Sequence, residues 1–151
     1  MKTRSKYNVS KDSSKRTYNG IIFDSIVEMR FYKEYVLPKY GSEIENYERQ
    51  KKYELQPKFT YKGKTVRPID YVADYVLFYS DGRVEVIDIK GFETADFKIK
   101  KKLFEYKYPE LDFKCISWSG IDGGWIETDA LKKARRERKK IKELKGKINN
   151  E

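Results

Sequence analysis

The spacing of apolar residues predicts two helices in the central part of the chain. Apolar positions recur at helical intervals over 26–37, after the capping pair Asp24-Ser25, and Pro38 is expected to end that helix. A second helical pattern runs over 95–108. The polar segment 41–52 carries neither pattern and is expected to be a connector or a short helix.

Runs rich in β-branched and aromatic residues predict the strands. A short apolar strand is expected after the turn at Tyr18-Asn19-Gly20. Four further strands are expected at 53–61, 71–79, 83–90 and 113–118, and a very basic third helix at about 129–145. The main elements follow the order α-β-β-β-α-β-α, which predicts one α/β (α+β) domain built on a mixed sheet.

One turn decides how the second and third of these strands align. Ser80-Asp81-Gly82 suits a three-residue hairpin loop with its glycine in the left-handed conformation. That loop would place Asp74 directly opposite Asp88, and opposite residues share a face of the sheet. Lys90, two residues beyond Asp88, would lie on the same face. A two-residue loop would instead put the two aspartates on opposite faces.

Two aspartates and a lysine within apolar runs need a chemical reason. Buried charges are costly unless they are paired, and two close carboxylates repel each other unless a cation lies between them. The alternative is a surface ion pair between Asp88 and Lys90, but the run 86–91 is too apolar for an ordinary exposed strand. Asp70 is a rival for Asp74, although it lies four residues further out on the same face.

The absence of histidine removes many kinds of enzyme from consideration. The 151 residues contain no histidine, which excludes Ser-His-Asp and Cys-His catalysis, His-metal nucleases and zinc deaminases. The single cysteine, Cys115, excludes an internal disulfide and fits a reducing cytoplasm. No apolar run approaches the length of a membrane span, so we expect no membrane partner. Carboxylates remain, and these oxygen ligands suit Mg²⁺ or Mn²⁺.

Positive charge predicts a polyanionic partner. The chain has 34 Lys and Arg against 24 Asp and Glu, a net charge of +10. This excess is concentrated at the ends, so we divide the chain into a flexible basic arm at 1–19, a central domain at 20–128 and a basic C-terminal helix and tail at 129–151. The two ends either grip nucleic acid or serve as solvated tails.

Two helices carry the candidate phosphate contacts. The second helix has a cluster of lysines whose alternative role is a solvated face, and only some of them can point at DNA. The C-terminal helix is too polar to bury a broad face, so it is either marginal in solution or docked on DNA or a partner chain. The candidates are Lys98, Lys100, Lys101, Lys102, Arg135, Arg136, Arg138, Lys139 and Lys140.

Five short motifs, in order, resemble the PD-(D/E)XK, restriction-endonuclease-like superfamily. They are Phe23-Asp24-Ser25-x-x-Glu28-x-Arg30, Leu55-Gln56-Pro57-Lys58-Phe59, Val72-Ala73-Asp74-Tyr75, Asp88-Ile89-Lys90-Gly91 and Phe97-x-x-Lys100-x-Lys102-Leu103-Phe104. Within the superfamily the chain is similar to small phage-encoded nucleases, long catalogued as a domain of unknown function and related to Holliday-junction resolvases. The αβββαβ core of the superfamily matches the predicted order over about 20–117.

The resemblance implies a role for each matching residue. It implies metal ligation by Asp74, Asp88 and the Ile89 carbonyl, and it makes Lys90 the catalytic lysine. It also implies an active-site role for Glu28, with metal contact direct or through water. The spacing Ser25-x-x-Glu28 by itself favours a capping box, and Glu28 can serve both purposes. Gln56 would either face the same cluster or make a structural hydrogen bond.

These observations lead to one expected function and three alternatives. We expect a Mg²⁺-dependent DNA endonuclease, with Mn²⁺ able to substitute and with no nucleotide cofactor. Junction resolution in phage recombination, in the host cytoplasm, would need a homodimer with two active sites. The alternatives are nicking or trimming of branched or single-stranded DNA, a non-catalytic DNA-binding recombination accessory protein, and an RNA-binding protein that would leave Asp74, Asp88 and Lys90 unexplained.

Overall fold

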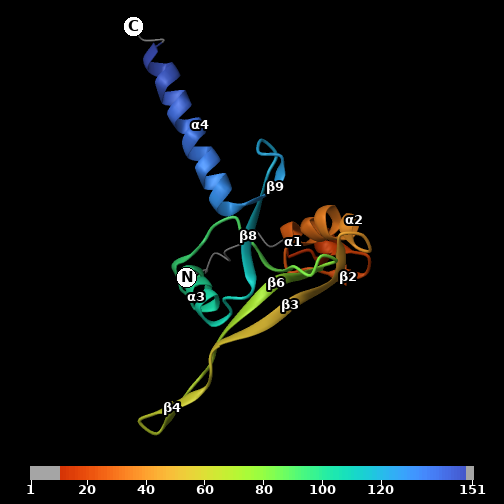
Figure 1. Ribbon diagram of the computed structural model, residues 1–151, viewed down its shortest axis with the longest axis vertical. Helices are drawn as coiled ribbons and strands as arrows, with labels where there is room; N and C mark the ends of the chain where they lie inside the picture. Colours follow the sequence, from red (N-terminus) through yellow and green to blue (C-terminus); the bar gives the residue numbers. More distant parts are fainter. Residues whose placement is uncertain (1–10, 149–151) are drawn as a thin grey trace.

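A five-stranded mixed sheet forms the centre of the molecule. The computed structural model describes residues 11–148, and Figure 1 shows the sheet with helices around it. Its strands lie in the order β3-β6-β7-β8-β9, and only the β7–β8 pair is parallel. The strands are β3 (Ile44–Gln56), β6 (Ile69–Tyr79), β7 (Val84–Ile89), β8 (Asp112–Ser119) and β9 (Gly124–Glu127). The predicted α/β (α+β) class with a mixed sheet is confirmed.

The predicted first helix is composed of three consecutive helical segments. They are α1 (Ile26–Phe31), the π-helical turn η2 (Tyr32–Val36) and α2 (Leu37–Lys39). The helix continues past Pro38 by one residue, whereas we expected it to end before the proline. In the π-helical turn the Leu37 N–H donates to the Tyr32 carbonyl, five residues earlier. A proline interrupts the α-helical pattern, in which each N–H bonds to the carbonyl four residues earlier, and the turn before Pro38 does not follow that pattern.

The other two helices lie close to their predicted positions. α3 spans Ala95–Lys107, and the Thr94 side chain caps it by accepting from the Phe97 N–H. α4 spans Thr128–Ile148 and projects away from the body (Figure 1). In the segment 11–148 no helix combines the length and the apolar character that a membrane crossing requires.

Part of the predicted N-terminal arm belongs to the folded body. A 3₁₀ turn, η1 (Ser13–Arg16), leads into β1 (Thr17–Tyr18), which pairs with β2 (Ile21–Ile22). Asn19-Gly20 forms the turn between them, and both residues have positive φ angles, 51° and 74°. Residues 1–10 of the predicted arm lie outside the described residues.

The prediction missed the part of β3 that precedes Tyr53, and all of β9. β3 begins at Ile44, inside the segment that we expected to be a connector. It lies at the edge of the sheet and pairs only with β6. One side of such a strand is open to solvent, so its residues are polar and its sequence lacks a clear strand pattern. β9 was missed because it is only four residues long and begins at a glycine, Gly124.

Beyond the sheet, β3 and β6 lead into a second, smaller hairpin. It consists of β4 (Phe59–Tyr61) and β5 (Lys64–Val66), joined at Lys62-Gly63. Both turn residues have positive φ angles, 48° and 73°. Figure 1 shows the hairpin and α4 projecting from opposite ends of the molecule.

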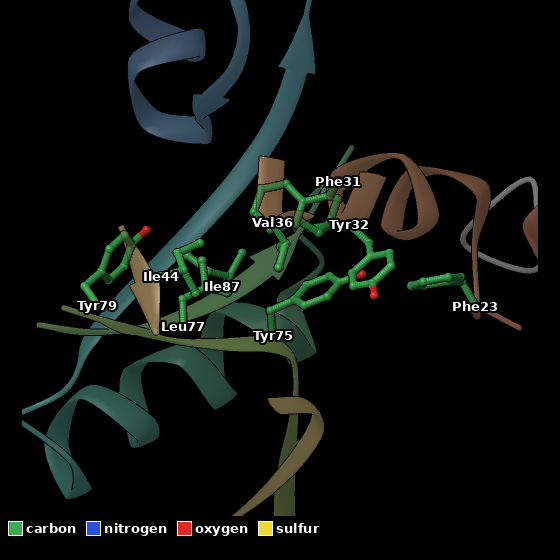
Figure 2. Packing of buried hydrophobic residues seen from close by; sticks show 10 residues of the cluster. Phe23, Phe31, Tyr32, Val36, Ile44, Tyr75, Leu77, Tyr79 and Ile87 are labelled. Atoms are coloured by element: carbon green, nitrogen blue, oxygen red, sulfur yellow. The ribbon is translucent and has the colours of Figure 1, made fainter. Parts of the chain in front are cut away.

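Apolar clusters lie on both faces of the sheet. Figure 2 shows the cluster in which residues of α1 and η2 pack on one face; it contains Phe23, Phe31, Tyr32, Val36, Ile44, Tyr75, Leu77, Tyr79 and Ile87. On the other face Phe97 and Phe104 of α3 pack against Val76 and Val86. Helices therefore cover both faces, and the strand ends between them are the place where polar groups from several elements can meet.

Candidate active site

The turn between β6 and β7 has the predicted geometry. Gly82 has a φ of 88°, and its N–H donates to the Tyr79 carbonyl at 3.0 Å. The Tyr79 N–H in turn donates to the Arg83 carbonyl at 2.9 Å, which closes a three-residue loop. The ladder pairs Val76 with Val86 and Tyr75 with Ile87, and one step further this register puts Asp74 opposite Asp88. The predicted alignment is confirmed.

Asp74 and Asp88 line a pocket of about 740 Å³. Its walls come from the start of α1, from β6, from the end of β7 and from α3. Six carboxylates and two lysines contribute to it: Asp24, Glu28, Asp70, Asp74, Asp88, Asp96, Lys90 and Lys100. A chain with a positive net charge thus gathers negative side chains at this one place.

Asp88 is the most enclosed of these carboxylates. Its side chain is 4% exposed, and Oδ1 accepts a hydrogen bond from the Tyr71 hydroxyl at 2.9 Å. Oδ2 lies 3.0 Å from Lys90 Nζ but receives no well-oriented hydrogen bond from the residues that the structure describes. Burial raises the pKa of Asp88, and the charge of Lys90 opposes that rise.

Two backbone hydrogen bonds and one aromatic contact fix the position of Lys90. Its backbone N–H donates to the Ile116 carbonyl at 2.9 Å, and its carbonyl accepts from the Ser117 hydroxyl. Its ammonium lies 4.4 Å from the centre of the Phe97 ring. The side chain is only 15% exposed, so the alternative of an ordinary surface ion pair with Asp88 is wrong.

Asp74 connects β6 to the end of β7. Its Oδ2 accepts a hydrogen bond from the Ile89 N–H at 2.7 Å. Burial is the largest cause that raises the pKa of Asp74, and the charges of Asp88 and Glu28 raise it further, to about 8. A carboxyl group in this setting favours a proton or another cation beside it.

Glu28 serves both as part of a helix cap and as part of the pocket. The Ser25 hydroxyl accepts from the Glu28 N–H and also lies 3.1 Å from Glu28 Oε1, to which it donates. The predicted bond from the Ser25 N–H to the carboxylate is replaced by this hydroxyl contact. Burial raises the pKa of Glu28 to about 6, against the lowering effect of the Ser25 hydrogen bond.

The structure does not bring Gln56 to the pocket, and a different glutamine, Gln50, contacts the pocket residue Glu28. Gln56 lies at the far end of β3, opposite Ile69, and is not among the residues that line the cavity. Gln50 donates from Nε2 to Glu28 Oε2 at 3.3 Å and has a φ of 53°. No sequence signal identified Gln50, because the strand that carries it was not predicted.

Sequence reasoning also missed Tyr71. Burial, followed by the charges of Asp88 and Asp74, raises the pKa of its hydroxyl far above its usual range. Tyr71 therefore remains a hydrogen-bond donor to Asp88 at every physiological pH. Its place in an aromatic strand gives no sign of that role.

Asp70, the rival for Asp74, lies at the edge of the same pocket. Its carboxylate forms an ion pair with Lys52 at 3.2 Å, and its carbonyl accepts from Lys100 Nζ at 3.0 Å. Asp70 is thus already paired with a lysine, whereas Asp74 faces other carboxylates. This difference favours Asp74 as the partner of Asp88.

Of the four candidate lysines on α3, only Lys100 lines the pocket. Lys98 and Lys102 are exposed, and Lys101 Nζ lies 3.9 Å from Glu105. The four lysines thus point in different directions, as expected for a helix that buries one face.

On α4, only Thr128 and Leu131 are buried, so the helix docks through its first turns. Arg138 forms an ion pair with Asp122 that includes a contact of 2.5 Å. The remaining candidate cations of this helix are exposed: Arg135, Arg136, Lys139 and Lys140.

The pocket offers two or three oxygen ligands rather than a closed cage. Among residues 11–148 no three side chains of His, Cys, Asp or Glu already enclose a space for a cation. Mg²⁺ commonly binds through one or two carboxylates and keeps several water molecules, so this arrangement fits it. The poorly satisfied Oδ2 of Asp88 is the atom with most to gain from a cation.

Comparison with known proteins places the whole pocket inside the region that matches one family. Residues 4–120 match the family described as protein of unknown function, DUF1064. This match includes every residue of the pocket and ends before α4. No curated protein matches the chain.

Proposed function

The chain belongs to the DUF1064 family, whose function is unknown, and we propose that it is a Mg²⁺-dependent DNA endonuclease. The observation that carries this proposal is the group of Asp74, Asp88 and Lys90 on β6 and at the end of β7, at the wall of an open pocket, where Asp88 is buried and the other two are partly buried. Carboxylates paired across two strands, with a lysine 3.0 Å from one of them, suit phosphodiester hydrolysis.

Asp74 and Asp88 would hold the metal ion, with the Ile89 carbonyl and Glu28 as additional oxygen ligands, Glu28 directly or through water. When bound, Mg²⁺ supplies positive charge beside the phosphate and favours ionisation of the attacking water; Mn²⁺ would substitute for it. No other cofactor is needed for hydrolysis, and the pocket carries no element that suggests a nucleotide cofactor.

Lys90 is the candidate catalytic residue of the chain itself. Its ammonium contacts the Phe97 ring and Asp88, so it stays at the wall of the pocket and does not extend into solvent. From there it can orient the attacking water or neutralise charge that develops on the phosphate. Tyr71 keeps the Asp88 carboxylate in place by its hydrogen bond at 2.9 Å.

DNA is the polyanion that best accounts for both signs of charge on the molecule. The net charge of +10 attracts a phosphate backbone, while the acidic pocket requires a cation before it can accept a phosphate. The resemblance to the PD-(D/E)XK nucleases favours branched DNA, above all four-way junctions. Resolving a junction would require a homodimer that acts in the cytoplasm, in the host cell if a phage encodes the chain.

A panel of DNA substrates tests the proposal. We expect the protein to cleave a four-way junction faster than a flap, a duplex or a single strand, with Mg²⁺ and with Mn²⁺ but not with EDTA. Cleavage is read on denaturing gels with each strand labelled in turn. Binding without cleavage in any divalent metal would contradict the nuclease and support a DNA-binding accessory protein. Preferred cleavage of the flap or the single strand would support a trimming enzyme.

Removing the exposed part of α4 tests its expected contact with DNA. A chain that ends at Arg138 keeps buried Leu131 and the Arg138–Asp122 ion pair, so its melting temperature should not change. It loses Lys139, Lys140, Lys142, Lys145 and Lys147. We expect weaker DNA binding and a salt slope that falls by about one for each phosphate that is no longer neutralised. An unchanged slope, measured by fluorescence anisotropy at several salt concentrations, would show that this segment does not touch phosphates.

A further inference from the structure

The hairpin formed by β4 and β5 stands apart from the hydrophobic core. None of its strand residues is buried, and Phe59 and Tyr61 are 44% and 60% exposed. A two-stranded hairpin with no core beneath it is at best marginally stable in water. We refer to residues 57–68 as the arm.

The pairing of the arm keeps one register from its base to its tip. Gln56 pairs with Ile69 and Phe59 with Val66, so the same register sets Pro57 opposite Pro68 and Lys58 opposite Arg67. Neither proline can donate a ladder hydrogen bond, which explains why β3 and β4 are separate strands. The prolines also stiffen the base from which the arm projects.

The two faces of the arm differ in chemistry. Residues that lie opposite each other share a face, so Phe59, Val66, Tyr61 and Lys64 are on one side and Thr60 and Thr65 on the other. The Lys62 ammonium lies 5.4 Å from the centre of the Tyr61 ring. One side of the ribbon is therefore aromatic and cationic, and the other carries two threonines near the tip and, by the same register, Lys58 and Arg67 at the base.

The arm carries four positive charges and no negative charge. They belong to Lys58, Lys62, Lys64 and Arg67. Two cations directly opposite each other, as at its base, destabilise a free hairpin. Exposed aromatic rings together with unbalanced cations on a projecting ribbon match the chemistry of a DNA groove, in which phosphates flank base edges that carry hydrogen-bonding groups and the apolar thymine methyl.

One strand, β6, connects the arm to the pocket. β6 runs from its base directly to Asp74, and Ile69, the first residue of β6, lines the pocket. Asp74 lies eleven positions after Gly63 at the tip. An extended chain of that length spans at most about 35 Å, which is about one turn of B-form DNA.

We infer that the arm binds in the major groove of the duplex that flanks the cleaved phosphodiester, about one helical turn from it. A two-stranded ribbon fits that groove, its cations reach the phosphates on either side, and Phe59 and Tyr61 contact base edges. The position relative to the cleaved bond rests on the proposed nuclease function, whereas the binding of duplex DNA by the arm does not.

Binding of labelled duplexes by the full chain in EDTA tests the arm separately from catalysis. We expect the pair Lys62→Gln and Lys64→Gln to weaken binding of a 25-base-pair duplex about tenfold and to lower the salt slope by about two. The comparison pair Lys39→Gln and Arg83→Gln removes two charges near the opposite end of β3 and β6. Both of these cations are already paired with carboxylates, so their loss should cause a smaller change. Wild type should bind a duplex of about 8 base pairs much more weakly, and the arm variant should show little of that length dependence.

A second variant tests the aromatic face. Replacing Phe59 and Tyr61 with serine should also weaken duplex binding, whereas Tyr106→Ser, at an 87% exposed ring on α3, should not. All of these positions are exposed or part of no core, so melting temperatures should stay the same. Equal binding by wild type and both arm variants would overturn the inference, as would losses seen only with unpaired or single-stranded DNA. Tight binding that depends on the arm, but without cleavage in any metal, would overturn the nuclease proposal alone.

Discussion

Replacing Asp88 with asparagine is expected to reduce Mg²⁺-dependent DNA cleavage by a factor on the order of 10³. Asparagine has nearly the same shape and can still accept the hydrogen bond from Tyr71 at Oδ1. It removes the negative charge that would hold the metal ion and that now pairs with Lys90 at 3.0 Å. The loss should appear in initial cleavage rates on the best DNA substrate, while the affinity for that DNA in EDTA stays within a few-fold.

The control for this result is Asp129→Asn, which makes the same chemical change at a side chain that is 77% exposed and does not line the pocket. It should cleave at the wild-type rate. If Asp88→Asn cleaves as fast as wild type, Asp88 is not a metal ligand and the assigned site is wrong. If it loses DNA binding together with its melting transition, the effect is one of folding, and Asp74→Asn becomes the decisive variant.

In the metal-free protein, stability is expected to fall as the pH rises from about 5 to about 9. Burial and the neighbouring carboxylates raise the pKa of Asp74 from its ordinary value of 3.8 to about 8, and burial raises that of Glu28 from 4.5 to about 6. Across this range the folded state holds more protons than the unfolded state, so each rise in pH favours unfolding. The stabilisation is complete below the ordinary pKa values and is lost as the pH passes through the raised ones.

Asp74→Asn should remove most of this pH dependence. Asparagine keeps an acceptor for the Ile89 N–H but has no charge to desolvate, so at pH 9 the variant should be more stable than wild type by on the order of 2 kcal/mol. Urea unfolding in EDTA at pH 5, 7 and 9 measures the effect. Mg²⁺ should stabilise wild type at pH 9 but not the variant, because only the wild-type carboxylate gains a cation. A wild-type stability that stays constant or rises over this range would contradict the prediction.

The two predictions concern aspartates of the same pocket that differ in their electrostatic surroundings. Asp88 is partly compensated by Lys90 and Tyr71, so its removal leaves a buried lysine without its carboxylate. Asp74 faces mainly other carboxylates, so its removal relieves repulsion. Neighbouring aspartates of the same pocket should therefore have opposite effects on stability, although both are needed for activity. A site that costs stability in the absence of its metal is typical of function rather than of packing.

Local sequence rules were sufficient where a short segment alone controls the geometry. The Ser80-Asp81-Gly82 loop could be interpreted from its glycine, and its register placed Asp74 opposite Asp88 without any knowledge of the rest of the fold. The mixed α+β class followed in the same way from apolar periodicity. The complete absence of histidine by itself excludes every catalytic or metal site that needs an imidazole.

Only the tertiary structure decided which distant groups join the two aspartates. Gln50 reaches Glu28 because a polar edge strand pairs with β6, and such a strand has no hydrophobic pattern to reveal it. Tyr71 contacts Asp88 across 17 positions of sequence, a contact that depends on how the strands twist and pack against α3. The projection of the arm was likewise invisible, since the chain on both sides of Pro57 has the composition of a strand. Burial by other segments, which no local pattern records, turned three charged residues into a site.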